Sequence, residues 1–167
     1  MKLWGAIIII AAGVMLGILP LAEMNERIRI LSEYNYALNR LKSELSTYGT
    51  SIPQSMRNLS LENKRASLFG AVSEHIELYG AMAFSEGWKS YIVKHRGMMG
   101  EQAYCAVIDL ADVLGRYSIE EQLAAIERAL CSISLGQDET KKKLQRVSKL
   151  YLGTSISLSL MLVVLLL

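Results

Sequence analysis

The chain has 167 residues, of which 51% are hydrophobic and only 20% charged, with a mean hydropathy of +0.26 and a formal net charge of +2. This composition is too apolar for an ordinary soluble domain or a disordered chain, and two cysteines are too few for a disulfide scaffold. The apolar excess lies at the ends, because all 16 acidic residues and all but one of the 18 basic residues lie between Glu23 and Lys149. The sequence therefore predicts a small domain held between two membrane segments.

An uncharged run over residues 3–22 opens the chain. A helix of that length spans about 30 Å, the thickness of the hydrocarbon core of a bilayer, so we predict a transmembrane helix there. The alternative is a cleaved signal peptide. Lys2 is the only basic residue of its n-region, however, and the residues at the end of the run match the small-residue cleavage pattern poorly. Within the run, Gly13 and Gly17 form a small-residue pair that would let two membrane helices approach closely.

The first half of the intervening segment carries helical patterns. Apolar residues spaced three and four apart from Leu31 to Tyr48 predict a long first helix, which ends at Gly49. A serine and a proline at positions suited to a helix start, Ser51 and Pro53, predict a short second helix. Two further apolar stripes cover residues 68–79 and 84–95.

The second half continues in the same way. A stripe over residues 99–113 ends at Gly115, and Ser118 with Glu121 forms a capping box that opens the next helix. We predict that Gly136 closes that helix and that a last one begins near Asp138 and continues into the membrane. No segment alternates with period two, so no strand is predicted.

A second uncharged run over residues 150–167 is almost entirely aliphatic and predicts a second transmembrane helix. It contains a second small-residue pair, Gly153 and Ser157. Basic residues flank the domain side of both runs, whereas only Lys2 lies on the other side, so the domain should face the cytoplasm. In that reducing compartment, Cys105 and Cys131 are expected to be small buried hydrophobic residues.

The predicted architecture is all-α. Five or six amphipathic helices with short connections bury their apolar stripes best as an antiparallel helical bundle, flanked by N- and C-terminal transmembrane helices. The boundaries are transmembrane helix 1 over residues 3–22, a cytoplasmic helical-bundle domain over 23–149, and transmembrane helix 2 over 150–167.

Motifs for chemistry are scarce. The sequence has no phosphate-binding glycine loop, no Cys-x-x-Cys and only two histidines, so we predict no cofactor, no metal site and no enzymatic activity. His75 is expected in solvent and His95 at the edge of the bundle. Asp109 and Asp112 share a helix face, as paired catalytic carboxylates would, but Arg116 four residues on offers Asp112 a plain ion pair.

A basic cluster lies just before the second apolar run. Beside a membrane it would bind anionic lipid head groups and fix topology, whereas nucleic-acid binding is disfavoured by the low net charge and the lack of interleaved aromatic residues. The members of this membrane-flanking cluster are Lys141, Lys142, Lys143, Arg146 and Lys149.

One further set of residues has a characteristic order and spacing: Lys2-Leu3-Trp4-Gly5 and the apolar run to Gly17, the regular leucines of residues 29–49, Trp88, Leu114-Gly115 with Ser118 and Gln122, and Lys149 to Gly153. In this order the chain resembles, over nearly its whole length, the stage III sporulation protein AB family of endospore-forming bacteria. The family's acidic residue after the Leu114-Gly115 segment comes one position late here.

The resemblance implies a membrane component of the channel complex in the mother cell membrane around the forespore. Such proteins resemble the cytoplasmic domain of the type II secretion platform protein, which implies a scaffold that couples a secretion-type ATPase to other membrane subunits. The resemblance is compatible with a homo-oligomer and does not define the oligomeric state. The alternative functions are a membrane-tethered sensor or regulator with a ligand pocket near Trp88, Tyr91 and Met99, and an enzyme that uses the two aspartates. The expected partner-contact residues are Glu120, Glu121, Gln122, Glu127 and Arg128.

Overall fold

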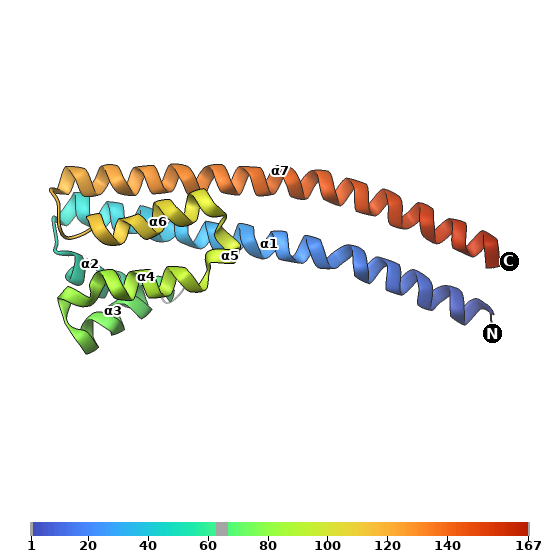
Figure 1. Cartoon of the computed structure of the whole chain (residues 1–167), viewed down its shortest axis with the longest axis horizontal. Helices are drawn as coiled ribbons and strands as arrows, with labels where there is room; N and C mark the ends of the chain where they lie inside the picture. The colour runs from blue at the N-terminus through green and yellow to red at the C-terminus, as the bar shows by residue number, and fades with distance from the viewer. Residues whose placement is uncertain (1, 63–66, 167) are drawn as a thin grey trace. The chain divides into compact units, whose positions relative to one another are not determined.

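The computed structural model describes the backbone of residues 2–62 and 67–166 and the side chains of residues 21–62, 68–150, 154 and 161. All regular elements among these residues are helices, so the predicted all-α class is confirmed (Figure 1). The chain divides into two compact units, Arg29–Gln137 and the paired ends Met1–Ile28 and Asp138–Leu167. We call the unit Arg29–Gln137 the bundle.

Two long helices, α1 (Lys2–Tyr48) and α7 (Ile119–Leu166), run through both units. The predicted break at Gly136 is therefore wrong, because α7 continues through it. A Cβ atom at Gly136 would lie 3.8 Å from Leu31 Cδ1 and 3.9 Å from the Met99 carbonyl oxygen, which are ordinary van der Waals distances. A glycine in a helix interior costs only about 1 kcal/mol, which the packing of a long helix offsets.

Within the part of the chain that the structure describes, no helix is both long and apolar enough to span a membrane. The side chains of residues 3–20, and nearly all of those after Leu150, lie outside the described residues. The two transmembrane helices predicted over 3–22 and 150–167 stay predictions.

Shorter helices complete the bundle between its portions of α1 and α7. Helix α2 packs on α3, α3 on α4, and α4 on α6, so consecutive elements are neighbours in space. The bounds are α2 (Ile52–Glu62), α3 (Ser67–Tyr79), the 3₁₀ helix η1 (Ala81–Ala83), α4 (Phe84–Lys94), the single-turn α5 (Arg96–Met99) and α6 (Glu101–Val113).

The predicted apolar stripes form the core of the bundle. Each helix contributes residues at helical spacing, and the largest fully buried side chains are Trp88 and Phe69. The outermost residue of two stripes, Tyr48 in α1 and Tyr79 in α3, is exposed because it lies at a helix end. The central stripe of α1 is confirmed by the buried residues Leu31, Tyr34, Leu38, Leu41 and Leu45.

Three glycines make the connections at one end of the bundle. Gly49, Gly80 and Gly115 have φ angles of +59°, +89° and +79°, a region that other residues rarely adopt. They follow α1, α3 and α6, and Figure 1 shows these three connections at the same end. We call it the glycine-turn end; the chain enters and leaves the bundle at the opposite end.

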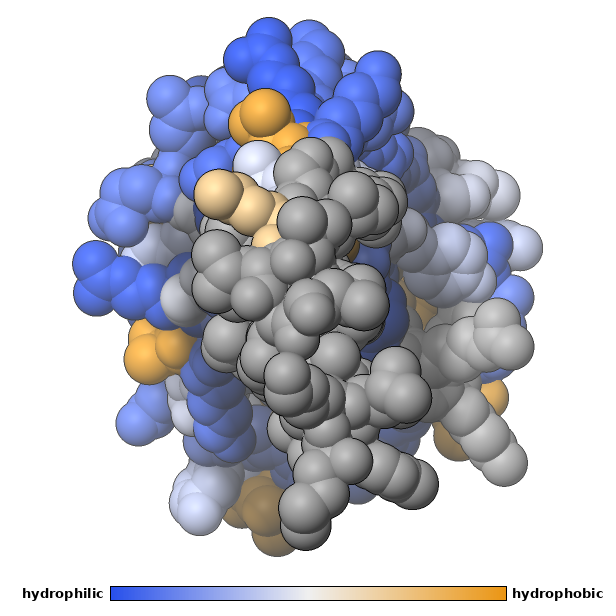
Figure 2. Space-filling view, turned by 90° about the vertical axis from the view of Figure 1, so that its right-hand side faces the viewer, coloured by the Kyte–Doolittle hydropathy of each residue, from blue (hydrophilic) through white to orange (hydrophobic). Residues whose placement is uncertain are grey.

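Polar residues cover the outside of the bundle. Ion pairs link neighbouring helices, as between Lys42 of α1 and Glu127 of α7 at 2.7 Å and between Arg57 of α2 and Glu77 of α3 at 3.4 Å. The described side chains visible in Figure 2 are mostly hydrophilic, with hydrophobic ones scattered among them. Both cysteines are exposed, so the expectation that Cys105 and Cys131 are buried is wrong.

Candidate functional site

The predicted partner-contact residues lie on the first turns of α7, where two of them hold the chain in place. The Glu121 amide donates to Ser118 Oγ at 3.3 Å, and the Ser118 amide donates to Glu121 Oε2 at 3.3 Å. This reciprocal pair is the predicted capping box. The Glu121 carboxylate is thus engaged at the start of its own helix.

Gln122 braces the connection between α6 and α7. Its Oε1 accepts a hydrogen bond from the Gly115 amide at 3.1 Å, and its Nε2 donates to the Tyr117 carbonyl oxygen at 2.8 Å. One amide side chain therefore satisfies a donor and an acceptor of a turn that lacks helical partners. The structure gives Gln122 a role in positioning the turn, and its predicted contact with a partner stays a prediction.

The other three predicted contact residues differ in their surroundings. Glu127 pairs with Lys42 across the bundle, whereas Arg128 is exposed and its Nε donates only to the Ala124 carbonyl oxygen one turn earlier, at 3.4 Å. Glu120 is exposed. Among the five predicted contact residues, Glu120 and Arg128 are therefore the ones whose side chains make no described bond to another helix or to the α6–α7 turn.

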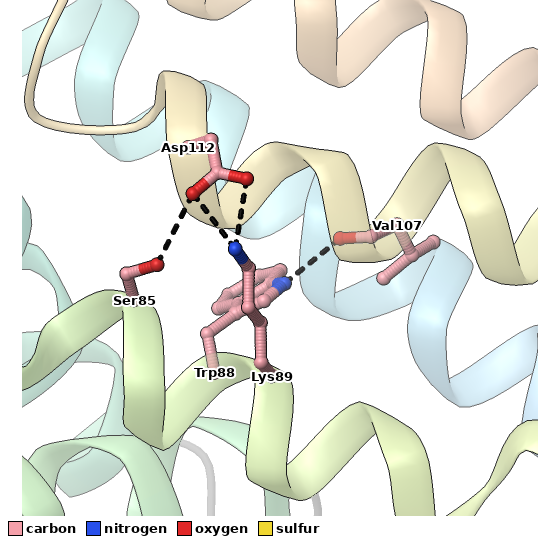
Figure 3. Close-up of polar contacts among 5 residues, drawn as sticks. All are labelled: Ser85, Trp88, Lys89, Val107 and Asp112. Atoms are coloured by element: carbon pink, nitrogen blue, oxygen red, sulfur yellow. Dashed lines mark hydrogen bonds and ion pairs between the residues drawn. The ribbon is translucent and has the colours of Figure 1, made fainter.

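Of the two aspartates that share a face of α6, Asp112 forms an ion pair with Lys89. Asp112 accepts two hydrogen bonds from Lys89 Nζ of α4, both at 2.8 Å, and Ser85 Oγ lies 3.4 Å away (Figure 3). These contacts, the Lys89 hydrogen bond first, hold the pKa of Asp112 below its ordinary value. A general acid needs a raised carboxylate pKa, so the chemistry here is that of a surface ion pair.

The ion-pair partner of Asp112 is Lys89 and not the predicted Arg116, whose charge is the last of the causes that lower the Asp112 pKa. The spacing on α6 indicated Arg116, but α6 ends at Val113, so Arg116 lies in the turn rather than one helical turn further on. Lys89 reaches Asp112 from α4 instead, a contact between helices that spacing within one helix cannot reveal.

The core beside the ion pair is closed. Trp88 is completely buried, and its Nε1 donates to the Val107 carbonyl oxygen at 2.8 Å, so the largest side chain of the bundle joins α4 to α6 (Figure 3). Met99 is buried as well, and a hollow beside Tyr91 has a volume of about 20 Å³, room for a single water molecule. These observations do not favour the ligand-pocket alternative.

Both histidines lie against aromatic rings. His95 Nδ1 is 3.1 Å from the Tyr34 hydroxyl oxygen, and burial raises the pKa of Tyr34, so this hydroxyl stays protonated and can donate. The bundle-edge position predicted for His95 is confirmed. His75 was expected in solvent, but it is half-buried against Tyr79 because Gly87 has no side chain in its way.

Some of the membrane-related predictions concern residues whose side chains the structure does not describe. The basic cluster lies on α7, and all five of its members are exposed. The packing residues Gly13, Gly17, Gly153 and Ser157 lie in helical backbone, but their side chains are outside the described residues. Among the described side chains, no three His, Cys, Asp or Glu residues group as a metal site would require.

These observations define a class: a small all-helical bundle with a closed core, continued by two long helices. The chain belongs to the stage III sporulation protein AB family, whose model matches residues 2–167. Membership implies a role at stage III of sporulation. No curated protein and no solved structure matches the chain.

Proposed function

We propose that this protein is a membrane-anchored scaffold of the channel complex between mother cell and forespore. In this role it couples a cytoplasmic secretion-type ATPase to other membrane subunits. The family places the protein at stage III of sporulation, and the finer role rests on the arguments that follow.

The continuity of α1 and α7 carries the proposal. Each helix leaves the bundle without a break and extends into one of the uncharged runs at residues 3–22 and 150–167. A break would let the bundle move independently of an anchor, whereas a continuous helix transmits displacement along its axis. Two such helices suit a part that links a soluble motor to a membrane assembly.

The basic cluster supports a membrane position for the start of the second run. Its five cations are exposed on α7 and precede the run directly, where they would bind anionic head groups on the cytoplasmic side. We therefore expect the full chain to fractionate with membranes and to resist extraction by alkaline carbonate.

The proposal calls for an energised partner because the sequence lacks a glycine-rich phosphate-binding loop with its lysine. Asp112 is engaged with Lys89. Movement of any cargo would then depend on an ATPase bound to the bundle.

Co-purification tests this proposal. The secretion-type ATPase of the same organism should co-purify with the full chain in detergent. A double charge reversal, Glu120→Arg with Arg128→Glu, should weaken the association at least severalfold. Glu74→Arg, a reversal at an exposed position of α3, is the matched control and should leave it unchanged. Absence of the ATPase from the wild-type complex would refute the proposed coupling.

A further inference from the structure

An open hollow of about 300 Å³ lies at the glycine-turn end of the bundle. Its walls come from segments far apart in the sequence: the start of α2, η1 with the start of α4, and the end of α6. Ile52, Phe84 and Leu114 make these walls apolar. The volume falls at the lower end of the range typical of binding sites.

The rim of the hollow exposes apolar residues to water. Met82 of η1 lines the hollow with 98% of its surface exposed, and Tyr79, which precedes η1 but does not line the hollow, is 69% exposed. Methionine and tyrosine are enriched at protein interfaces, where methionine adapts its shape to a partner. A fully exposed methionine beside an apolar hollow is therefore typical of a contact surface.

The charge at the hollow is positive. Arg116 lines it, is exposed, and makes no ion pair within the described part of the chain. Lys89 holds the Asp112 carboxylate at 2.8 Å, and Arg116 acts on that carboxylate through its charge without forming an ion pair, so these three groups leave one net positive charge beside the hollow. A guanidinium group binds a carboxylate through two parallel hydrogen bonds. An apolar side chain accompanied by a carboxylate thus complements this site.

We propose that this hollow docks a segment of a soluble protein, which buries one apolar side chain between Ile52, Phe84 and Leu114 and places a carboxylate on Arg116. The proposal rests on the scaffold role only in requiring a soluble protein partner. The ATPase is the partner that the scaffold role names, but the chemistry of the hollow defines the docking segment independently of that name.

Photo-crosslinking in sporulating cells tests the proposal with the full chain in place. Met82 is replaced by p-benzoylphenylalanine, a change that its exposure allows without loss of folding. Leu61, an apolar and 77% exposed position at the end of α2 that does not line the hollow, is the matched control. The crosslinked peptide is then sequenced. Arg116→Glu is combined with the Met82 probe, and Lys94→Glu serves as its charge-reversal control.

The expected result is an adduct at position 82 and none at position 61. Its crosslinked residue should be apolar, with Asp or Glu within one helical turn. Arg116→Glu should reduce its yield about tenfold or more, as loss of a central interface arginine does, while Lys94→Glu leaves it unchanged. An adduct that depends on Arg116 with a protein other than the ATPase would confirm the docking site and count against ATPase coupling. No adduct, an adduct insensitive to Arg116→Glu, or an adduct with lipid or a second copy of this chain would overturn the inference.

Discussion

The Asp112 carboxylate is held as an anion by Lys89, and this gives the fold one defined dependence on pH. The pKa of Asp112 in the folded chain lies below the ordinary value of about 3.9. The contribution of the pair to stability is therefore present above about pH 4 and is lost as pH falls through the lowered pKa.

We predict that Lys89→Gln raises the pKa of Asp112 toward its ordinary value, because the largest cause of the shift is the hydrogen bond from Lys89. A carbon-detected NMR titration of the side-chain carboxyl group measures both proteins. A pKa of Asp112 above the ordinary value in the wild-type protein would contradict the ion-pair description. It would instead favour the alternative of an enzyme that uses the two aspartates.

Two glycines inside helices should respond in opposite ways to alanine. A Cβ atom at Gly87 would lie 2.8 Å from His75 Cδ2 and 3.0 Å from His75 Cβ, so Gly87→Ala must push the ring aside and should cost about 1–3 kcal/mol. A Cβ atom at Gly70 meets nothing within 4 Å, so Gly70→Ala should stabilise the fold by about 0.5–1 kcal/mol. Urea denaturation of the two variants tests this difference in sign, and equal shifts would disprove the packing of His75 against α4.

Single-residue surroundings were the hardest feature to predict from the sequence. The burial of His75 depends on the missing side chain of Gly87 on another helix, and the partner of Asp112 comes from α4. Patterns within one helix carry no information on such contacts. The edge position of His95 was predictable because the residue continues the stripe of its own helix.

The α6–α7 turn depends on one side chain, Gln122. Gln122→Leu removes its bonds to the Gly115 amide and the Tyr117 carbonyl oxygen, and should destabilise the fold by about 1–2 kcal/mol. The specific signature is faster hydrogen exchange at the Gly115 amide, measured by NMR. Glu120→Leu, two residues earlier and exposed, is the control. Unchanged exchange at Gly115 in Gln122→Leu would refute the bracing role.

Helices were predictable where local chemistry decides them. The capping box at Ser118 and the apolar stripe of α1 depend on residues within a few positions of one another, and the structure confirms both. The break at Gly136 was wrong because a glycine stops a helix only where the chain turns into a left-handed conformation. At Gly136 the backbone stays helical, because the packing of a long helix outweighs the cost of a glycine in its interior.

At the scale of the whole molecule, some features again follow from the sequence pattern, whereas others depend on tertiary contacts. The all-helical class follows from periodicity, and the family follows from the order of features along the chain. The hollow at the glycine-turn end was not predicted, because its walls come from segments about sixty residues apart that only the tertiary fold brings together. The glycines that end two of the predicted helices, Gly49 and Gly115, were the signals available in the sequence.

The compartment of the bundle decides whether a cytoplasmic ATPase can reach it at all. Cys105 and Cys131 are both exposed in the bundle, so the native chain carries its own probes. Labelling of intact spheroplasts that express the full chain, with a membrane-impermeant maleimide, tests the compartment directly. A Lys2→Cys variant that lacks both native cysteines is the control for the opposite side of the membrane.

The account predicts that the two native cysteines are labelled only after lysis, whereas the cysteine at position 2 is labelled in intact spheroplasts. Labelling of Cys105 or Cys131 in intact spheroplasts would put the bundle outside the cytoplasm and contradict direct coupling to an ATPase.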